Sequence, residues 1–170
     1  MKKRTLFVVL FLSALLALLP LSGCENAKGD YFAPFAGGYV AEIRGTFRGI
    51  AFAAELKAGQ PAPEGGRAAT LTFYAPETLA GTVVARAADG ALSLSVGGLT
   101  VTTDAAEGYR ALIDIFPASG EVTEVKVIEN GLTRVSGEGF SVDFRPDGSP
   151  AAAENTAAAV VVVRFSGENC

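Results

Sequence analysis

The sequence contains no histidine, and only two cysteines, one of which is the last residue. Without histidine, a serine or cysteine nucleophile has no imidazole base beside it, so the usual hydrolase triads are excluded. Metal sites built from histidine and cysteine are excluded for the same reason. We therefore expect no enzyme activity, no metal site and no cofactor.

Pairs of carboxylates are the remaining catalytic groups to weigh. Asp114 with Glu107, and Asp143 with Glu138, are the candidate acid–base pairs. Acidic side chains are usually solvated on an outer face, and this is what we expect of all four. Arginines on predicted strands are expected on outer faces or edges rather than around a ligand, namely Arg44, Arg48, Arg86, Arg134 and Arg164.

Long apolar runs are also lacking. The run from Leu6 to Leu19 has 14 residues, fewer than the roughly 20 that a transmembrane helix needs. It follows the basic residues Lys2, Lys3 and Arg4 and precedes small residues, which is the order of an export signal. The sequence therefore predicts a protein exported from the cytoplasm.

The run Leu21-Ser22-Gly23-Cys24 resembles the bacterial lipobox. This resemblance implies a diacylglyceryl thioether on Cys24, cleavage after Gly23, and acylation of the new amino terminus, for example with palmitate. Two or three acyl chains hold a protein stably at a membrane. An ordinary secretory signal is the alternative, and it would leave Cys24 as a thiol or remove it. We expect a lipid-anchored protein of the cell envelope, on the extracytoplasmic side of the membrane.

The predicted organisation is a signal peptide (1–23), a tether (24–38) and a single β-rich domain (39–170). Cleavage removes three of the 14 basic residues, so 11 remain against 18 acidic residues, a net charge of −7. An acidic surface of this kind is a poor partner for nucleic acid and for anionic lipid headgroups. The aromatic residues of the tether, Tyr31, Phe32 and Phe35, are expected to pack back onto the domain.

Cys170 has no internal partner if Cys24 carries lipid. The domain is then without a disulfide, and its stability must come from the hydrophobic core. Cys170 is expected to lie on a frayed end, with pairing between molecules as the alternative.

Alternating apolar and polar residues predict a series of short β-strands from Tyr39 onward. Asp89-Gly90 and Asn130-Gly131 mark two tight hairpins. The unbroken run Val160–Val163 predicts a last strand covered on both faces. The predicted strands span 39–48, 50–57, 67–75, 82–87, 91–96, 99–103, 121–129, 132–138, 139–145 and 157–165, with a loop at 58–66 and a turn at 147–150.

One helix is predicted at 104–116, after the sixth strand. Its apolar residues follow the helical spacing i, i+3, i+4 and i+7, namely Tyr109, Leu112, Ile113 and Phe116, and Pro117 ends it. Consecutive hairpins predict an antiparallel meander, and a meander that curls around a helix forms a half-barrel or an incomplete barrel. The predicted fold class is therefore mainly β with one short helix.

Several motifs resemble those of bacterial lipoproteins of the LolA-like half-barrel type. They are the strand pair of 39–57, the step Pro76-x-x-Leu79-x-Gly81, the short helix near 105–116, and Phe140-x-x-x-Phe144 followed by Asp147-Gly148-x-Pro150. The resemblance implies a concave apolar sheet, covered by a helix, that holds acyl chains or another apolar ligand.

Two functions are consistent with these patterns. The first is an anchored, non-catalytic protein that binds an apolar or lipidic ligand on the concave face of its sheet. The second is a packed β-domain that recognises a protein or the cell wall. For the first, the residues expected to reach the ligand are Phe47, Phe73, Leu94, Phe140 and Phe144, and their alternative role is an ordinary hydrophobic core.

Overall fold

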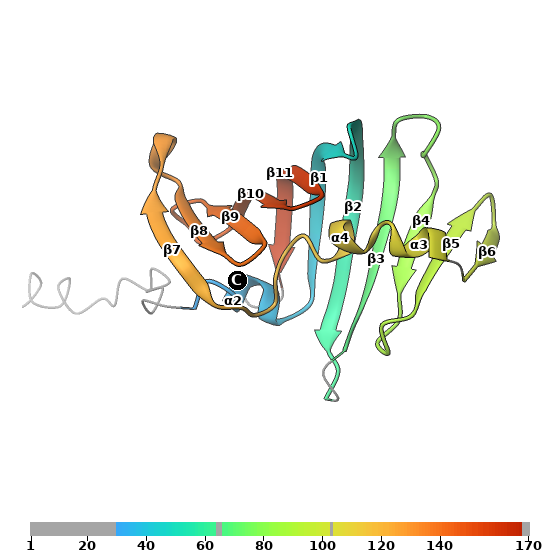
Figure 1. Ribbon diagram of the computed structural model, residues 1–170, viewed down its shortest axis with the longest axis horizontal. Coiled ribbons are helices and arrows are strands. Elements are labelled where there is room, and N and C mark those ends of the chain that lie inside the picture. The colour runs from blue at the N-terminus through green and yellow to red at the C-terminus, as the bar shows by residue number, and fades with distance from the viewer. Residues whose placement is uncertain (1–29, 64–65, 103, 168–170) are drawn as a thin grey trace, which may run out of the picture.

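The computed structural model describes residues 30–63, 66–102 and 104–167 (Figure 1). The predicted signal peptide, Cys24 and Cys170 lie outside these ranges. The strands are β1 (Tyr39–Phe47), β2 (Ile50–Pro61), β3 (Arg67–Ala75), β4 (Val83–Arg86), β5 (Leu92–Val96), β6 (Leu99–Val101), β7 (Val122–Val127), β8 (Thr133–Gly137), β9 (Phe140–Phe144), β10 (Pro150–Asn155) and β11 (Ala158–Gly167). The helices are α2 (Ala33–Ala36), α3 (Asp104–Glu107) and α4 (Arg110–Ile113), with a 3₁₀ turn, η1, at Glu129–Gly131.

The described strands form one antiparallel sheet in the order β6-β5-β4-β3-β2-β1-β11-β10-β9-β8-β7. The chain starts in the middle at β1, proceeds by hairpins to the edge strand β6, and resumes at the opposite edge with β7. From β7 the chain returns by hairpins to β11, which pairs with the full length of β1. Because β6 and β7 are opposite edges, the sheet stays open, and the predicted mainly β half-barrel is confirmed.

The connection from β6 to β7 must cross the whole sheet. Figure 1 shows α3, α4 and the segment after them running across the strands from the side of β5 to the side of β7. This crossing segment (104–121) covers one face, and its apolar side chains Ala106, Leu112, Ile113, Ile115 and Phe116 are all buried. We call the covered face concave and the opposite face convex.

The predicted single helix at 104–116 is wrong in detail. The segment forms two one-turn helices, α3 and α4, separated by Gly108 and Tyr109. Glycine has a low helix propensity, so it interrupts the helix at that point. The apolar spacing remains useful, because it identified the face that packs on the sheet.

Three predictions for the strands also fail. Residues 151–155 were assigned to no element, yet they belong to β10, and β2 continues to Pro61 through the start of the predicted loop. The last strand, β11, is not covered on both faces, since Val160 and Val162 are buried while Val161 and Val163 are 60% and 50% exposed. Its convex side faces solvent, so burial alternates.

The hairpin turns follow the predicted chemistry. Asn130 and Gly131 adopt φ values of 64° and 73° between β7 and β8, and Gly90 adopts 89° between β4 and β5. Positive φ suits glycine and asparagine, which is why these dipeptides mark the turns. None of the helices in the described ranges has the length and apolar character that crossing a membrane requires.

A candidate ligand pocket beneath the crossing segment

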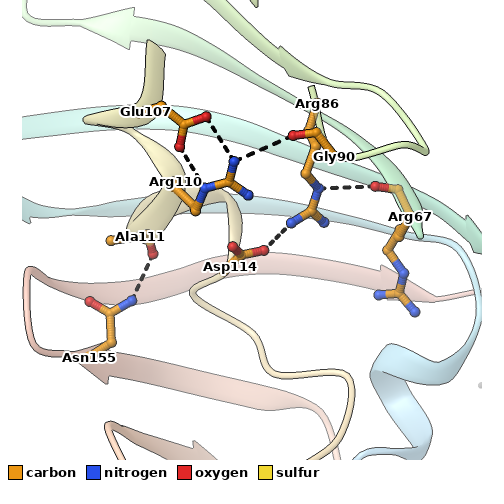
Figure 2. Close-up of polar contacts among 8 residues, drawn as sticks. All are labelled: Arg67, Arg86, Gly90, Glu107, Arg110, Ala111, Asp114 and Asn155. Atoms are coloured by element: carbon orange, nitrogen blue, oxygen red, sulfur yellow. Dashed lines mark hydrogen bonds and ion pairs between the residues drawn. The ribbon is translucent and has the colours of Figure 1, made fainter. Parts of the chain in front are cut away.

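Polar contacts fix the crossing segment to the sheet (Figure 2). Arg86 of β4 pairs with Asp114, which follows α4, and also donates to the Arg67 carbonyl oxygen at 3.0 Å. From the other half of the sheet, the Asn155 amide donates to the Ala111 carbonyl oxygen at 2.7 Å. The segment is therefore held from both sides, in addition to its apolar packing.

Arg110 adds a local contact within the crossing segment. Its guanidinium donates to both carboxylate oxygens of Glu107, at 2.7 and 2.9 Å, and to the Gly90 carbonyl oxygen in the β4–β5 turn. The hydrogen bond from Arg110 holds the pKa of Glu107 below its ordinary value. α3 and α4 are thus tied to one another across the Gly108 break.

A pocket of about 400 Å³ lies at the end of the sheet where β1 turns into β2. Strands β1, β2, β3 and β5 supply its walls on one side, and the crossing segment supplies Ala105, Gly108 and Tyr109 on the other. Its volume falls within the roughly 300–1,000 Å³ of small-molecule sites. The lining side chains from the sheet are Phe47, Arg48, Ile50, Phe52, Phe73, Leu79 and Leu94.

The walls of this pocket are apolar and largely aromatic. Phe52 and Phe73 meet edge to face with ring centroids 5.7 Å apart, and Tyr109 lies 5.7 Å from both Phe47 and Phe73. Phe52 and Phe73 are almost fully buried, whereas Ile50 is 55% exposed. The pocket therefore has a buried aromatic floor and a mouth at the β1–β2 turn.

A second hollow, of about 430 Å³, lies at the opposite ends of the same strands. It is lined by Tyr39 at the start of β1, Arg67 at the start of β3 and Arg86 at the end of β4, with Asp114 from the crossing segment. Two of these charged groups, Arg86 and Asp114, already pair with each other. Because several charged side chains line this polar hollow, it is a poorer site for an apolar ligand than the aromatic pocket.

Next to the polar hollow, aromatic side chains form a closed cluster. Phe35 of α2 stacks on Phe116 with ring centroids 5.0 Å apart and also contacts Tyr39, Phe144 and Phe165 at 5.8 to 6.1 Å. Phe35 is fully buried. The expected packing of Tyr31, Phe32 and Phe35 onto the domain is confirmed, since Tyr31 contacts Phe144 and Phe32 contacts Phe140.

Burial in this cluster also changes the pKa of the Tyr39 hydroxyl. It raises the pKa of Tyr39 to about 12, although the nearby Arg67 and Arg86 guanidinium groups act in the opposite direction. The guanidinium carbon of Arg67 lies 5.6 Å from the centre of the Tyr39 ring, and its Nη2 donates to the Phe35 carbonyl oxygen. Tyr39 therefore stays protonated in the folded protein at any ordinary pH.

The five residues predicted to reach a ligand divide between these two regions. Phe47, Phe73 and Leu94 all line the aromatic pocket. Phe144 belongs to the closed cluster, and the ring of Phe140 lies over Gly120 and Gly137 beside Phe32. The structure brings the first three together and places the other two elsewhere.

Four large side chains of the pocket were not identified from the sequence as ligand contacts, namely Ile50, Phe52, Leu79 and Tyr109. Phe52 and Ile50 belong to a predicted strand, and Leu79 lies within the step Pro76-x-x-Leu79-x-Gly81. Alternation and turn signals therefore located these residues in the fold but did not indicate that they line a pocket. Tyr109 was assigned to the apolar stripe of the helix. That stripe was the available signal, because a residue on it must face the sheet.

The predicted acid–base pairs are not formed. Glu107 binds Arg110 and Asp114 binds Arg86, while Asp143 binds Arg134 through two hydrogen bonds of 2.6 and 2.8 Å. Asp143 is 7% exposed, so the expectation that it is solvated is wrong. A bidentate arginine partner is what allows a carboxylate to be buried on this strand.

Arg86 also departs from prediction, because its side chain lies on the concave side with Asp114 rather than on an outer face. Within the described residues, no group of three or more histidine, cysteine, aspartate or glutamate side chains is placed to hold a metal ion.

No protein-family model and no curated protein matches this sequence. Among solved structures, an uncharacterized conserved protein from Thermus thermophilus is similar, with 14% identity and a TM-score of 0.50 over 83% of this chain and 85% of that one. MucB is similar at 14% identity and a TM-score of 0.49, over 82% of this chain and 58% of MucB. A LolA superfamily protein from Nitrosomonas europaea shares 5% identity with a TM-score of 0.43, over 79% of this chain and 88% of that one. The first of these likenesses concerns the fold alone.

Proposed function

We propose that this chain is a non-catalytic lipoprotein of the cell envelope that binds an apolar or lipidic ligand in the aromatic pocket. Acyl chains on Cys24 hold it to the membrane on the extracytoplasmic side. The ligand lies between the sheet and the crossing segment, at the β1–β2 end of the concave face.

The observation that carries this proposal is the aromatic pocket itself. Its volume of about 400 Å³ is similar to that of the polar hollow, but its walls are mainly apolar and include four aromatic rings. Small-molecule sites are lined predominantly by hydrophobic and aromatic side chains. Burial of a ligand's apolar surface against these walls contributes about 25 cal/mol per Å².

Filling the pocket with a side chain tests the proposal. Leu94 is half-buried in the wall, so Leu94→Trp should place an indole in the space that the ligand occupies. We expect the affinity for a fluorescent fatty-acid probe to fall by about tenfold or more, equivalent to about 1.4 kcal/mol. Leu99→Trp is the matched control, because Leu99 is 78% exposed on the edge strand β6. Absence of probe binding by the wild type, or equal loss in both variants, contradicts the proposal.

The anchor is tested separately. Cys24→Ala removes the sulfur that accepts the diacylglyceryl group, so we expect loss of labelling by a palmitate analogue and accumulation of the uncleaved precursor. Cys170→Ala, the matched control, should label like the wild type. Equal labelling of the Cys24→Ala variant and the wild type would exclude the lipid anchor.

The exposed edges of the sheet favour a second candidate function. Leu99 and Val101 on β6, and Val127 on β7, are 78%, 52% and 75% exposed on unpaired edge strands. An open edge with apolar side chains is where an extended peptide adds as a further strand. A protein-interaction module would bind there, and it is the function that remains if the wild type binds no apolar probe.

A further inference from the structure

We propose that Arg48 binds the anionic group of the ligand, so that the pocket selects an acyl chain with a negatively charged head over a neutral one. This inference rests on the proposed function and names the class of ligand. Three observations about Arg48 support it.

Arg48 lies where the head of a bound acyl chain would emerge. It is the charged residue in the lining of an otherwise apolar pocket, and it is exposed beside Ile50 at the mouth. Its guanidinium carbon is 5.2 Å from the centre of the Phe47 ring. The two Nη atoms lie 3.4 Å from the place where a Cβ would stand on Gly108, so the absent side chain leaves room for the guanidinium. Arg48 therefore spans the mouth from the turn to the crossing segment.

The guanidinium of Arg48 lies over the Phe47 ring but has no acidic partner among the described residues. Within the described residues, the ion pairs of arginine join Arg86, Arg110, Arg134 and Arg164 to acidic partners, and none includes Arg48. Its hydrogen-bond donors therefore remain available to a ligand. A guanidinium presents these donors in a planar fork that matches a carboxylate or phosphate.

The turn that carries Arg48 is not one that favours arginine. Phe47 pairs with Ile50, which leaves a two-residue loop with φ values of 51° at Arg48 and 80° at Gly49. Both values are positive, as in a type I′ turn, where asparagine or glycine is preferred at the first position. A long side chain in this conformation is strained, and such strain is found at functional sites.

An amphiphile matches both the apolar walls of the pocket and the cation at its mouth. Its chain is stabilised by leaving water for the aromatic walls, whereas its charged head is costly to bury and must stay at the mouth. At the mouth the head meets one cation, Arg48. A neutral head gains no ion pair there, so the pocket should discriminate by charge.

Competition with an uncharged apolar fluorescent probe tests the inference. Dodecanoate, dodecyl phosphate and dodecanol share one chain length and differ in the head. For the wild type, we expect dodecanoate and dodecyl phosphate to bind about tenfold more tightly than dodecanol. The comparison of dodecanoate with dodecyl phosphate shows whether the Arg48 guanidinium prefers a carboxylate or a phosphate.

Arg48→Asn removes the charge and at the same time supplies the residue that a type I′ turn favours, so the variant should fold at least as stably as the wild type. We expect the affinity ratio of dodecanoate to dodecanol to fall to about one, and Arg48→Lys to restore part of it. Arg44→Asn is the matched control, because Arg44 is exposed on the opposite face of β1 and its loss changes the net charge equally. Its ratio should equal that of the wild type.

The outcomes separate the two proposals. If the wild type binds dodecanol as tightly as dodecanoate, or if Arg48→Asn leaves the ratio unchanged, the role of Arg48 is overturned while the apolar pocket stands. If the wild type binds neither amphiphile and no apolar probe, the proposed function fails, and this inference fails with it.

Discussion

The two ends of strand β1 carry aromatic rings on the same concave face, but their surroundings differ. At the Tyr39 end, Phe35 enters from α2 and stacks on Phe116, so the cluster is closed. At the Phe47 end, Tyr109 covers the rings from one side and a pocket of about 400 Å³ remains. The same residue type is core at one end and pocket wall at the other. The difference lies in the segments that cover the sheet rather than in the strands.

This comparison explains why strand patterns alone do not locate a ligand site. Alternation determines which face of β1 is apolar, and it does so equally at both ends. Whether the face is filled depends on a residue such as Phe35, which lies in a separate segment before the strand. Two predictions test this difference.

The largest expected effect comes from removing one ring at each end. Phe35→Ala leaves a cavity among tightly packed rings and should lower the free energy of unfolding by about 3–5 kcal/mol. Phe47→Ala removes a ring that already borders open space, so it should cost less, about 1–2 kcal/mol. Denaturant unfolding of both variants measures the two values. Equal losses would show that the Phe47 end is packed as tightly as the Phe35 end.

A smaller effect is expected from alkaline pH, and only at the closed end. Tyr39 has a pKa of about 12 when folded and about 10 when unfolded, so between these values the unfolded state loses its proton first. The contribution of Tyr39 to stability is full below pH 10 and decreases as the pH rises towards 12, by about 2–3 kcal/mol in total.

Tyr39→Phe removes this dependence, because phenylalanine has no ionisable hydroxyl. The difference in unfolding free energy between the wild type and Tyr39→Phe, measured from pH 8 to pH 12, should therefore shift in favour of the variant. Tyr74→Phe serves as the control, since burial also raises the pKa of Tyr74 but this side chain is 54% exposed, so its variant should show a weaker dependence on pH. A difference between wild type and Tyr39→Phe that stays constant with pH would show that Tyr39 is not buried as a neutral phenol.

Most of the fold could be predicted from the sequence where side chains alternate clearly. The strands around Phe73 and Val142, and the hairpins at Asp89-Gly90 and Asn130-Gly131, were identified by this pattern. β10 was missed because its core is Ala151-Ala152-Ala153, where buried and half-buried positions carry the same small side chain and no alternation is visible. Its pairing with β9 and β11, rather than its own propensity, makes it a strand.

The candidate site was less predictable for a related reason. Phe47, Phe73 and Leu94 were chosen because they alternate with polar neighbours, and they do share one pocket. Phe144 has the same pattern, but Phe35 and Tyr31 cover it, and no feature of β9 indicates them. Arg48 was expected on an outer face or edge of the sheet, and its place at the pocket could not be predicted because it depends on where the crossing segment passes Gly108.

The pairing of β1 with β11 has a consequence for how this sheet assembles. The pairs from β1 to β6 join neighbours in the chain, as do those from β7 to β11, so each group can form by local contacts, which favours rapid folding. The β1–β11 ladder instead joins residues as distant as Tyr39 and Gly167, and closing a loop of that length is entropically costly. Until it forms, the edges of β1 and β11 present unpaired N–H and C=O groups that invite aggregation. A chain that emerges from its N-terminal end would expose β1 in this state until β11 had also emerged, so a chaperone that shields β1 would raise the yield of folded protein.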